Sequence, residues 1–302
     1  MSPDDFVLAL RALDAPVFLD DQGMPSPIGV EFTATTSDGR SVLVTQLSAA
    51  LNGAVTDPDA FVRAIERSGY QGAGITGSGQ IYFLELPPRG TALGDRLART
   101  GPVAAAELLP IARSAVDALA GLPPHGLITP STLRIAGDGI VAFRWPGLAQ
   151  AFRAAGVDVA TLSRELGAAL YLAPEVQRGA LPDTRTDIFA LGVTLYTALT
   201  GRPPFGGRTT ATVMAVVLAD DGAPATTDTG VLTSALLRAI EQNPADRWHD
   251  LGQFRDALGT APVGARRTPP ERLAATRRGC AGTAMLFLVG GLVLWAVSEY
   301  IS

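Results

Sequence analysis

Twenty consecutive residues near the end of the sequence, residues 279–298, carry no charged side chain. A helix of this length, at 1.5 Å per residue, is about 30 Å long, which matches the hydrocarbon core of a bilayer. The alternative is a helix buried in a soluble core, but such a helix normally keeps a polar face that this run lacks. We therefore expect a transmembrane helix over residues 279–298, followed by a short tail over residues 299–302.

The charges that flank this run predict its orientation. Residues 259–278, here named the Arg-rich linker, contain five arginines and one acid, Glu271, whereas only Glu299 follows the run. By the positive-inside rule, we expect a single-pass membrane protein with the body of the chain on the cytoplasmic side. The expected membrane contacts are the bilayer, through residues 279–298, and anionic lipid, through the Arg-rich linker.

The side chains that the sequence lacks exclude several kinds of chemistry. All 24 Lys+Arg positions are arginine, so Schiff-base formation and phosphate binding by a lysine amine are excluded for this chain. One cysteine, Cys280, and two histidines, His125 and His249, are too few for a disulfide framework or a Cys/His zinc site. A net charge of −5 with a mean hydropathy of +0.24 excludes a basic protein that coats nucleic acid, so we expect no nucleic-acid partner.

The first part of the chain has the pattern of a small β-rich layer. Short β-favouring runs predict strands over residues 30–35, 41–47 and 81–86. Between them, Asp57 and Pro58 predict the start of a helix over residues 57–67, with the aspartate as its cap.

The second part, after residue 87, has helical periods. The strongest predict helices over residues 103–122 and 188–200, and for the second we expect Asp187 as the cap and Gly201 as the end. Weaker helical patterns occupy residues 210–218, 232–242 and 251–258.

Four ordered motifs in this second part carry a resemblance to a known family. They are Tyr-Leu-Ala-Pro-Glu at 171–175, Asp-Ile-Phe-Ala-Leu-Gly at 187–192, Leu-Thr-Gly-Arg-Pro-Pro-Phe at 199–205 and Asn-Pro-Ala-Asp-Arg at 243–247. In this order and spacing they resemble the C-terminal lobe of bacterial serine/threonine protein kinases. The resemblance covers about residues 16–258 and implies an α+β, two-lobed protein-kinase-like fold. Residues 1–86 would form a small β-rich N-lobe and residues 87–258 a mainly α-helical C-lobe, before the Arg-rich linker and the transmembrane helix.

The resemblance also implies which positions would carry chemistry. Phosphoryl transfer needs an aspartate that orients the attacking hydroxyl, ligands for Mg²⁺ and a lysine that pairs with the phosphates. The corresponding positions hold Thr45, Leu127, Thr129, Thr132 and Trp145. Because none of these is a carboxylate or an amine, we expect no catalytic residue, no metal site and a pseudokinase, which is not an enzyme.

The positions that the resemblance assigns to the nucleotide pocket are also altered. Leu43 stands where the family has an alanine against adenine, so its extra carbons would project into the pocket. If Glu85 lies at the back of the pocket, the hinge amide that would donate to adenine falls on Pro87 or Pro88, and proline has no N–H. We therefore expect an occluded pocket and no bound cofactor.

Four other positions match residues that stabilise the family's C-lobe. Glu175 and Arg247 match a buried ion pair, and a bidentate arginine–carboxylate geometry suits such a site. Asp187 matches the residue that caps its own helix and hydrogen-bonds the catalytic-loop backbone. His125 matches a packed core histidine.

Together these features favour a membrane-tethered pseudokinase that acts as a scaffold or regulator of a signalling protein, whose identity the sequence does not give. One alternative is an atypical serine/threonine kinase or nucleotidyltransferase that uses non-standard residues. The acids available for that role are Asp138, Asp158, Glu165 and Asp183. A third hypothesis is a non-catalytic nucleotide sensor.

Overall fold

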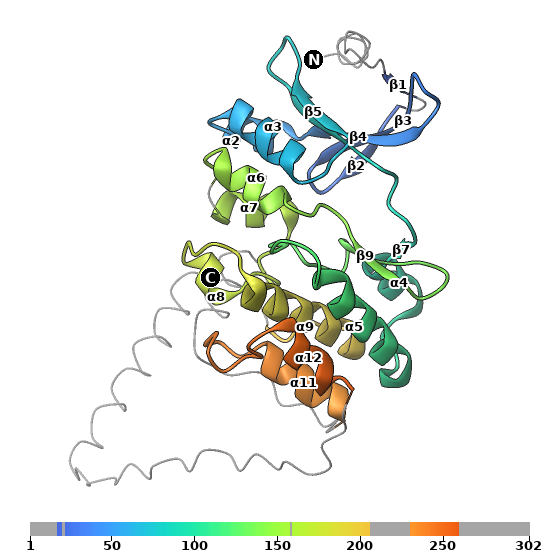
Figure 1. Ribbon diagram of the computed structural model, residues 1–302, viewed down its shortest axis with the longest axis vertical. Helices are drawn as coiled ribbons and strands as arrows, with labels where there is room; N and C mark the ends of the chain where they lie inside the picture. Colours follow the sequence, from blue (N-terminus) through green and yellow to red (C-terminus); the bar gives the residue numbers. More distant parts are fainter. Residues whose placement is uncertain (1–16, 20–21, 158, 206–229, 260–302) are drawn as a thin grey trace, which may run out of the picture. The chain divides into compact units, whose positions relative to one another are not determined.

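Short runs with many β-branched and aromatic residues near the start of the chain form an antiparallel sheet. In the computed structural model, which describes residues 17–19, 22–157, 159–205 and 230–259, the sheet has six strands in these ranges. They are β1 (Val17–Leu19), β2 (Met24–Ser26), β3 (Gly29–Thr36), β4 (Ser41–Leu47), β5 (Gly72–Ile75) and β6 (Ile81–Glu85). Their order is β1-β3-β4-β6-β5, and β2 also pairs with β3. Figure 1 shows this layer at the blue end of the molecule.

Two helices, α2 (Ala49–Ala54) and α3 (Pro58–Arg67), follow β4 in the N-lobe. The predicted cap of α3 is confirmed, because the side chain of Asp57 accepts a hydrogen bond from the backbone N–H of Ala60 at 2.8 Å. Phe61 and Ile65, four residues apart on one face of α3, are fully buried. This face packs on the sheet and on the helix α6 (Leu148–Ala154).

The second part of the chain is mainly helical, as its periodicity predicts. Besides α6 it contains α4 (Leu93–Thr100), α5 (Ala105–Leu119), α7 (Val159–Leu166), α8 (Pro174–Gln177), α9 (Thr184–Thr200), α11 (Val231–Ala239) and α12 (Leu251–Ala257). A small antiparallel sheet, with the order β7-β8-β9, consists of β7 (Thr91–Ala92), β8 (Leu133–Ile135) and β9 (Val141–Phe143).

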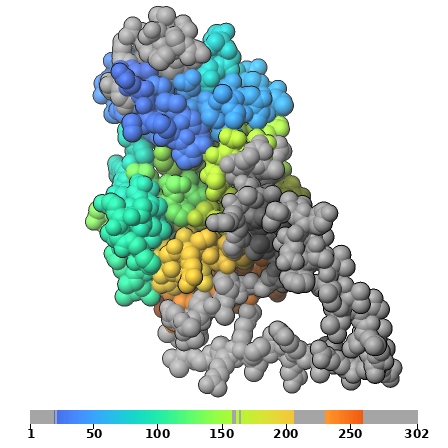
Figure 2. Space-filling model, turned by 180° about the vertical axis from the view of Figure 1, so that it is seen from behind, coloured from blue at the N-terminus to red at the C-terminus, as the bar shows by residue number. Residues whose placement is uncertain are grey.

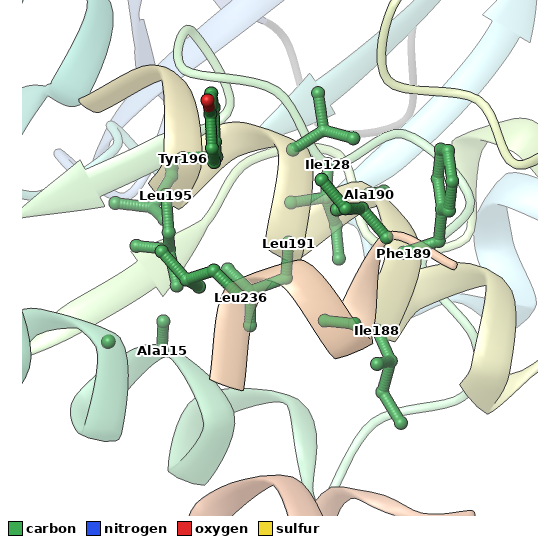
Figure 3. Close-up of a cluster of buried hydrophobic side chains, with 14 of the residues drawn as sticks. Ala115, Ile128, Ile188, Phe189, Ala190, Leu191, Leu195, Tyr196 and Leu236 are labelled. Atoms are coloured by element: carbon green, nitrogen blue, oxygen red, sulfur yellow. The ribbon is translucent and has the colours of Figure 1, made fainter. Parts of the chain in front are cut away.

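Helix α9 forms the centre of this lobe. Residues 186–198 of this helix are all buried, which is typical of a helix with neighbours on every side. Helices α5, α11 and α12 pack around it, and Figure 3 shows Leu191 and Leu195 of α9 among side chains from α5 and α11. Gly192 permits the closest approach, because a Cβ atom there would lie 2.8 Å from the Cβ of Ala239.

A second apolar cluster joins the two lobes. Phe61 of α3 packs against Phe152 of α6 with ring centroids 5.0 Å apart, and Thr56 donates from its backbone N–H and its hydroxyl to the Ala155 carbonyl, both at 2.9 Å. In the space-filling view of Figure 2, the yellow-green C-lobe segment touches the blue N-lobe. The lobes are therefore in direct contact in addition to their covalent connection through residues 86–90.

Several predicted boundaries need correction. Helix α9 begins at Thr184, and its cap is Asp183, which forms a capping box with Thr186. Asp187 is therefore inside the helix, not at its cap. Helix α4 was not predicted, because Ala92 at its start makes no side-chain cap and Gly94 weakens the helical pattern.

Some predictions fall on residues whose structure is not described. These are the helix over residues 210–218, most of the Arg-rich linker and the transmembrane helix over residues 279–298. Among the described helices, none has the length and apolar character required to cross a bilayer.

Candidate functional site in the interlobe cleft

Four of the five positions that the resemblance assigns to catalysis meet at one small pocket below the N-lobe sheet. The cavity volume is about 10 Å³, which is roughly the minimum that one water molecule needs. Its lining consists of Pro27, Leu127, Thr129, Ser131, Thr132, Trp145, Leu166 and Ala168. Thr45, the fifth position, is fully buried in β4 and does not line this pocket.

The hydroxyl groups of this pocket bond mainly to their own loop. The Thr132 hydroxyl donates to the Leu127 carbonyl at 2.9 Å and accepts from the Thr129 N–H at 2.8 Å. The Thr129 and Ser131 hydroxyls are 2.9 Å apart. These bonds fix the loop backbone, and in the described part of the chain no group of three or more His, Cys, Asp or Glu side chains is placed to hold a metal ion.

The loop is anchored to α9 through Asp187. Its carboxylate accepts from the backbone N–H of His125 at 2.6 Å and of Gly126 at 2.9 Å. Burial raises the pKa of Asp187 to about 7, although the two N–H donors favour the carboxylate and lower it. The expected bond from Asp187 to the loop backbone is thus present, while the expected cap is not.

His125 is a fully buried, neutral side chain. Its Nε2–H donates to the Arg144 carbonyl at 2.8 Å, and its Nδ1 accepts from the Leu127 N–H at 3.2 Å. Complete burial lowers the pKa of His125 to about 4. Both ring nitrogens are therefore used for positioning, and neither is free for acid–base chemistry.

Arg144, which the sequence did not single out, carries the largest polar cluster of the cleft. Its Nη1 donates to Glu31 Oε2 of β3 at 3.1 Å, and its Nη2 donates to Glu85 Oε1 at the end of β6. The three side chains are only 11%, 14% and 11% exposed, in the order Arg144, Glu31 and Glu85. The cluster therefore joins the C-lobe to two strands of the N-lobe in a largely dehydrated setting.

Trp145 lies beside this cluster in a strained conformation. Its φ angle of 62° is in the left-handed region, which costs a bulky residue about 1–3 kcal/mol. Its Nε1–H donates to Glu85 Oε1 at 3.3 Å, and the Arg144 guanidinium carbon lies 4.6 Å from its ring centroid. These contacts hold the indole at the position where the resemblance implied a metal ligand.

The positions of the expected nucleotide pocket lie near the same cluster. Leu43 is directly opposite Glu85 in the β4–β6 ladder. Pro87 and Pro88 lie in the connection between the lobes, where Arg134 Nη2 donates to the Gly90 carbonyl at 2.6 Å. Whether these residues exclude a nucleotide stays a prediction.

The pair Glu175–Arg247 is bidentate, with Nη1–Oε1 at 2.6 Å and Nη2–Oε2 at 2.8 Å. The Arg247 side chain is fully buried. This pair joins α8 to the segment before α12 and is remote from the pocket lining.

The acids named for an atypical enzyme do not converge in the described residues. Asp183 caps α9, Asp138 accepts from the Ile140 N–H in the exposed β8–β9 turn, and Glu165 lies on α7. Asp158 is outside the described residues. The cleft carboxylates that the structure reveals are Glu31 and Glu85.

Comparison with known proteins finds similarity to protein kinases. A scan against models of protein families matches none of them. The serine/threonine-protein kinase PknB of Mycolicibacterium smegmatis is 30% identical over 197 residues, which cover 63% of this chain and 32% of that protein. PknB of Mycobacterium tuberculosis is 29% identical over 190 residues (60% and 30%), and PknL of the same species is 32% identical over 190 residues (59% and 46%). The chain thus spans about a third of the length of the PknB relatives.

A solved structure extends the comparison to the fold. The crystal structure of Rad53 1-466 in complex with AMP-PNP has a TM-score of 0.58 at 17% identity, covering 81% of this chain and 64% of that chain. The predicted two-lobed α+β protein-kinase fold is therefore confirmed, and the chain is homologous to the bacterial serine/threonine kinase PknB. One expectation is contradicted: the matched relatives are named serine/threonine-protein kinases, which overturns the inference, drawn from five substituted positions, that the chain is not an enzyme.

Proposed function

We propose that the chain is a kinase-fold regulator or scaffold, which binds a protein of a serine/threonine-kinase signalling system. The observation that carries the proposal is the contrast between the two parts of the site. The contacts that fix the C-lobe, Glu175–Arg247 and Asp187 to the loop backbone, are complete. The catalytic-loop hydroxyls, in contrast, are bonded within their own loop, which fixes this loop as a rigid surface for a partner.

Serine/threonine phosphotransfer is the second candidate function, and the names of the relatives favour it. In the described cleft, carboxylates that could hold a metal ion would come from Glu31 and Glu85, and both are bonded to Arg144. Phosphotransfer would therefore use different residues from those that the motif positions suggest.

Attachment to a membrane is the third element of the proposal. It rests on the uncharged residues 279–298 and on the five arginines of the Arg-rich linker. The full-length chain should sediment with membranes, and a chain that ends at residue 278 should be released. A full-length protein that remains in the supernatant after high-speed sedimentation would contradict membrane attachment.

The two candidate functions are separated by experiments on the full-length chain in nanodiscs. The first measures transfer of radiolabelled phosphate from ATP, with Mg²⁺ and with Mn²⁺, to the chain itself and to a generic protein substrate. Metal-dependent transfer that is lost in Glu85→Gln would establish the enzyme, whereas a melting temperature raised by ATP without transfer would favour a nucleotide sensor.

The second experiment tests the partner. A photo-crosslinking residue replaces Leu181, an exposed apolar residue between α8 and α9, and the control carries it at Met24 in the N-lobe; both side chains are 69% exposed. A regulator predicts one discrete adduct from Leu181 in native membranes, and the identified protein must rebind the purified chain. Adducts of equal yield from both positions, or an adduct that fails to rebind, would refute the proposed regulator.

A further inference from the structure

The inner face of the N-lobe sheet carries two carboxylates where it meets the C-lobe. Glu31 pairs with Thr45, and Thr45 pairs with Phe83 on the next strand. Glu85 lies two residues after Phe83 and therefore on the same face of the sheet. Both carboxylates thus reach the cleft from adjacent parts of one surface.

Arg144 reaches these carboxylates from the other lobe, and its backbone is fixed there. Its N–H donates to the Thr132 carbonyl at 2.9 Å, and its carbonyl accepts from His125. His125 is in turn held through its backbone N–H by Asp187 of α9. The backbone of Arg144 is therefore fixed to α9 through His125 and Asp187, and its guanidinium extends from this fixed point to the N-lobe.

We propose that Arg144, Glu31 and Glu85 form an interlobe clamp, which closes the cleft with the chain's own side chains and opens it when Arg144 releases the two carboxylates. Arg144 is 113 residues away from Glu31 in the sequence and 59 residues away from Glu85, so the closed clamp joins distant parts of the chain. The clamp lies next to Trp145, whose indole contacts both Glu85 and Arg144.

The polar atoms around the clamp show that it is poised to open. Four buried atoms there have no hydrogen-bond partner in the described residues: Glu31 Oε1, Thr45 Oγ1, Tyr70 Oη and Arg144 Nε. A permanent core normally satisfies such atoms, because each unpaired buried group costs free energy. Opening the cleft would hydrate all four.

The charges of the cluster also favour opening of the clamp. Two carboxylates share one guanidinium at the contact. Burial raises the pKa of Glu85, against the lowering effect of Arg144. Burial, followed by the charge of Arg144, lowers the pKa of Arg134, while Glu31 and Glu85 act in the opposite direction. Arg134 therefore repels Arg144 and attracts the two carboxylates that Arg144 binds.

A second interlobe contact limits how far the cleft opens. Phe61 on α3 and Phe152 on α6 remain packed, and Thr56 remains bonded to Ala155. Release of Arg144 should therefore expose β3, β6 and the loop of residues 125–145 without separating the lobes. This inference goes beyond the proposed function and does not depend on it.

Hydrogen–deuterium exchange of the full-length chain in nanodiscs tests the clamp. In Arg144→Met, amide exchange in β3, β6 and residues 125–145 should accelerate by about tenfold or more, with α9 and α3 unchanged. The matched control is Arg255→Met, which removes an exposed ion pair with Asp117 on the far side of the C-lobe core and should leave all of these segments unchanged.

The double variant Glu31→Gln/Glu85→Gln keeps the side-chain shapes and should reproduce the effect of Arg144→Met. Adding Arg144→Met to it should cause no further acceleration, because the same interaction is already lost. Exchange equal to the control in both variants would overturn the clamp, and so would additive effects. If Arg144→Met accelerates exchange in α9 as well, the arginine also serves global stability. The clamp then stands only if the isosteric double variant accelerates exchange in β3, β6 and residues 125–145 with α9 unchanged.

Discussion

Arg247→Ala should strongly destabilise the C-lobe, because this side chain uses all five of its N–H groups. Two donate to Glu175, and three donate to the carbonyls of Arg185, Glu241 and Gln242. The guanidinium carbon also lies 4.7 Å from the ring centroid of Phe189 on α9. Removal of the side chain leaves Glu175 and three carbonyls without their donor and opens a gap against α9.

The expected loss follows from these contacts. Breaking a buried ion pair by removal of one partner costs about 3–5 kcal/mol. The Glu175 side chain is 20% exposed, so water partly compensates the carboxylate, while the three carbonyls and the lost contact with Phe189 add to the cost. For a domain of this size, about 3–5 kcal/mol corresponds to a fall of roughly 6–20 °C in melting temperature.

The assay is thermal and urea unfolding of the full-length chain in nanodiscs, followed by circular dichroism. The control is Arg255→Ala, whose ion pair with Asp117 is exposed and should contribute about 1 kcal/mol or less. Equal unfolding midpoints for the two variants would refute the reasoning, since they would mean that the Arg247 network contributes no more than a surface pair.

Three further predictions concern the loop anchor and the lobe contact. In Asp187→Asn, the amide group faces one of the two N–H donors of His125 and Gly126, so unfolding free energy should fall by about 1–3 kcal/mol. His125 has a pKa lowered to about 4, below its unfolded value, so its contribution to stability is lost as pH falls from about 6.5 to 4, by about 3 kcal/mol at most. Burial raises the pKa of Asp187 to about 7, so this residue changes stability with pH in the opposite direction. The measurement is therefore the difference in urea midpoint between the wild type and His125→Gln. This difference should shrink as pH falls, and a constant difference would contradict the prediction. In Gly147→Ala, with a φ of +78°, the new Cβ would lie 2.2 Å from the Ser68 hydroxyl, so the melting temperature should fall, and Ser68→Gly should restore part of the loss.

Local signals predicted the elements that depend on neighbours in sequence. Asp57 followed by Pro58 predicted the start of α3, and a short β-favouring run predicted β4 to the residue. The start of α9 was misplaced because Asp183 and Asp187, one helical turn apart, are both suitable caps. Only the three-dimensional structure distinguishes them, since it places Asp187 against a loop some 60 residues earlier in the chain.

The candidate site in the cleft was predicted only in part, because its other residues also depend on contacts between distant parts of the chain. The motif positions Leu127, Thr129, Thr132 and Trp145 do meet at one pocket. Arg144 and Glu31 were missed, because a glutamate opposite the apolar face of a strand is normally solvated, and an arginine before a turn carries no signal of its own. Their partnership depends on how the lobes meet, which no local pattern records.

Arg247 and Arg144 differ in a way that predicts which part of the fold opens first. Arg247 satisfies every N–H that it carries, whereas Arg144 leaves its Nε–H buried without a partner in the described residues and shares two carboxylates. An interaction with unpaired buried groups gains more from hydration and therefore opens at a lower free energy. Exchange at the cleft should accordingly precede exchange at α9 in the wild type. A chain in which α9 and the cleft exchange together would show that the two lobes unfold as one cooperative unit, and that the clamp adds no separate step.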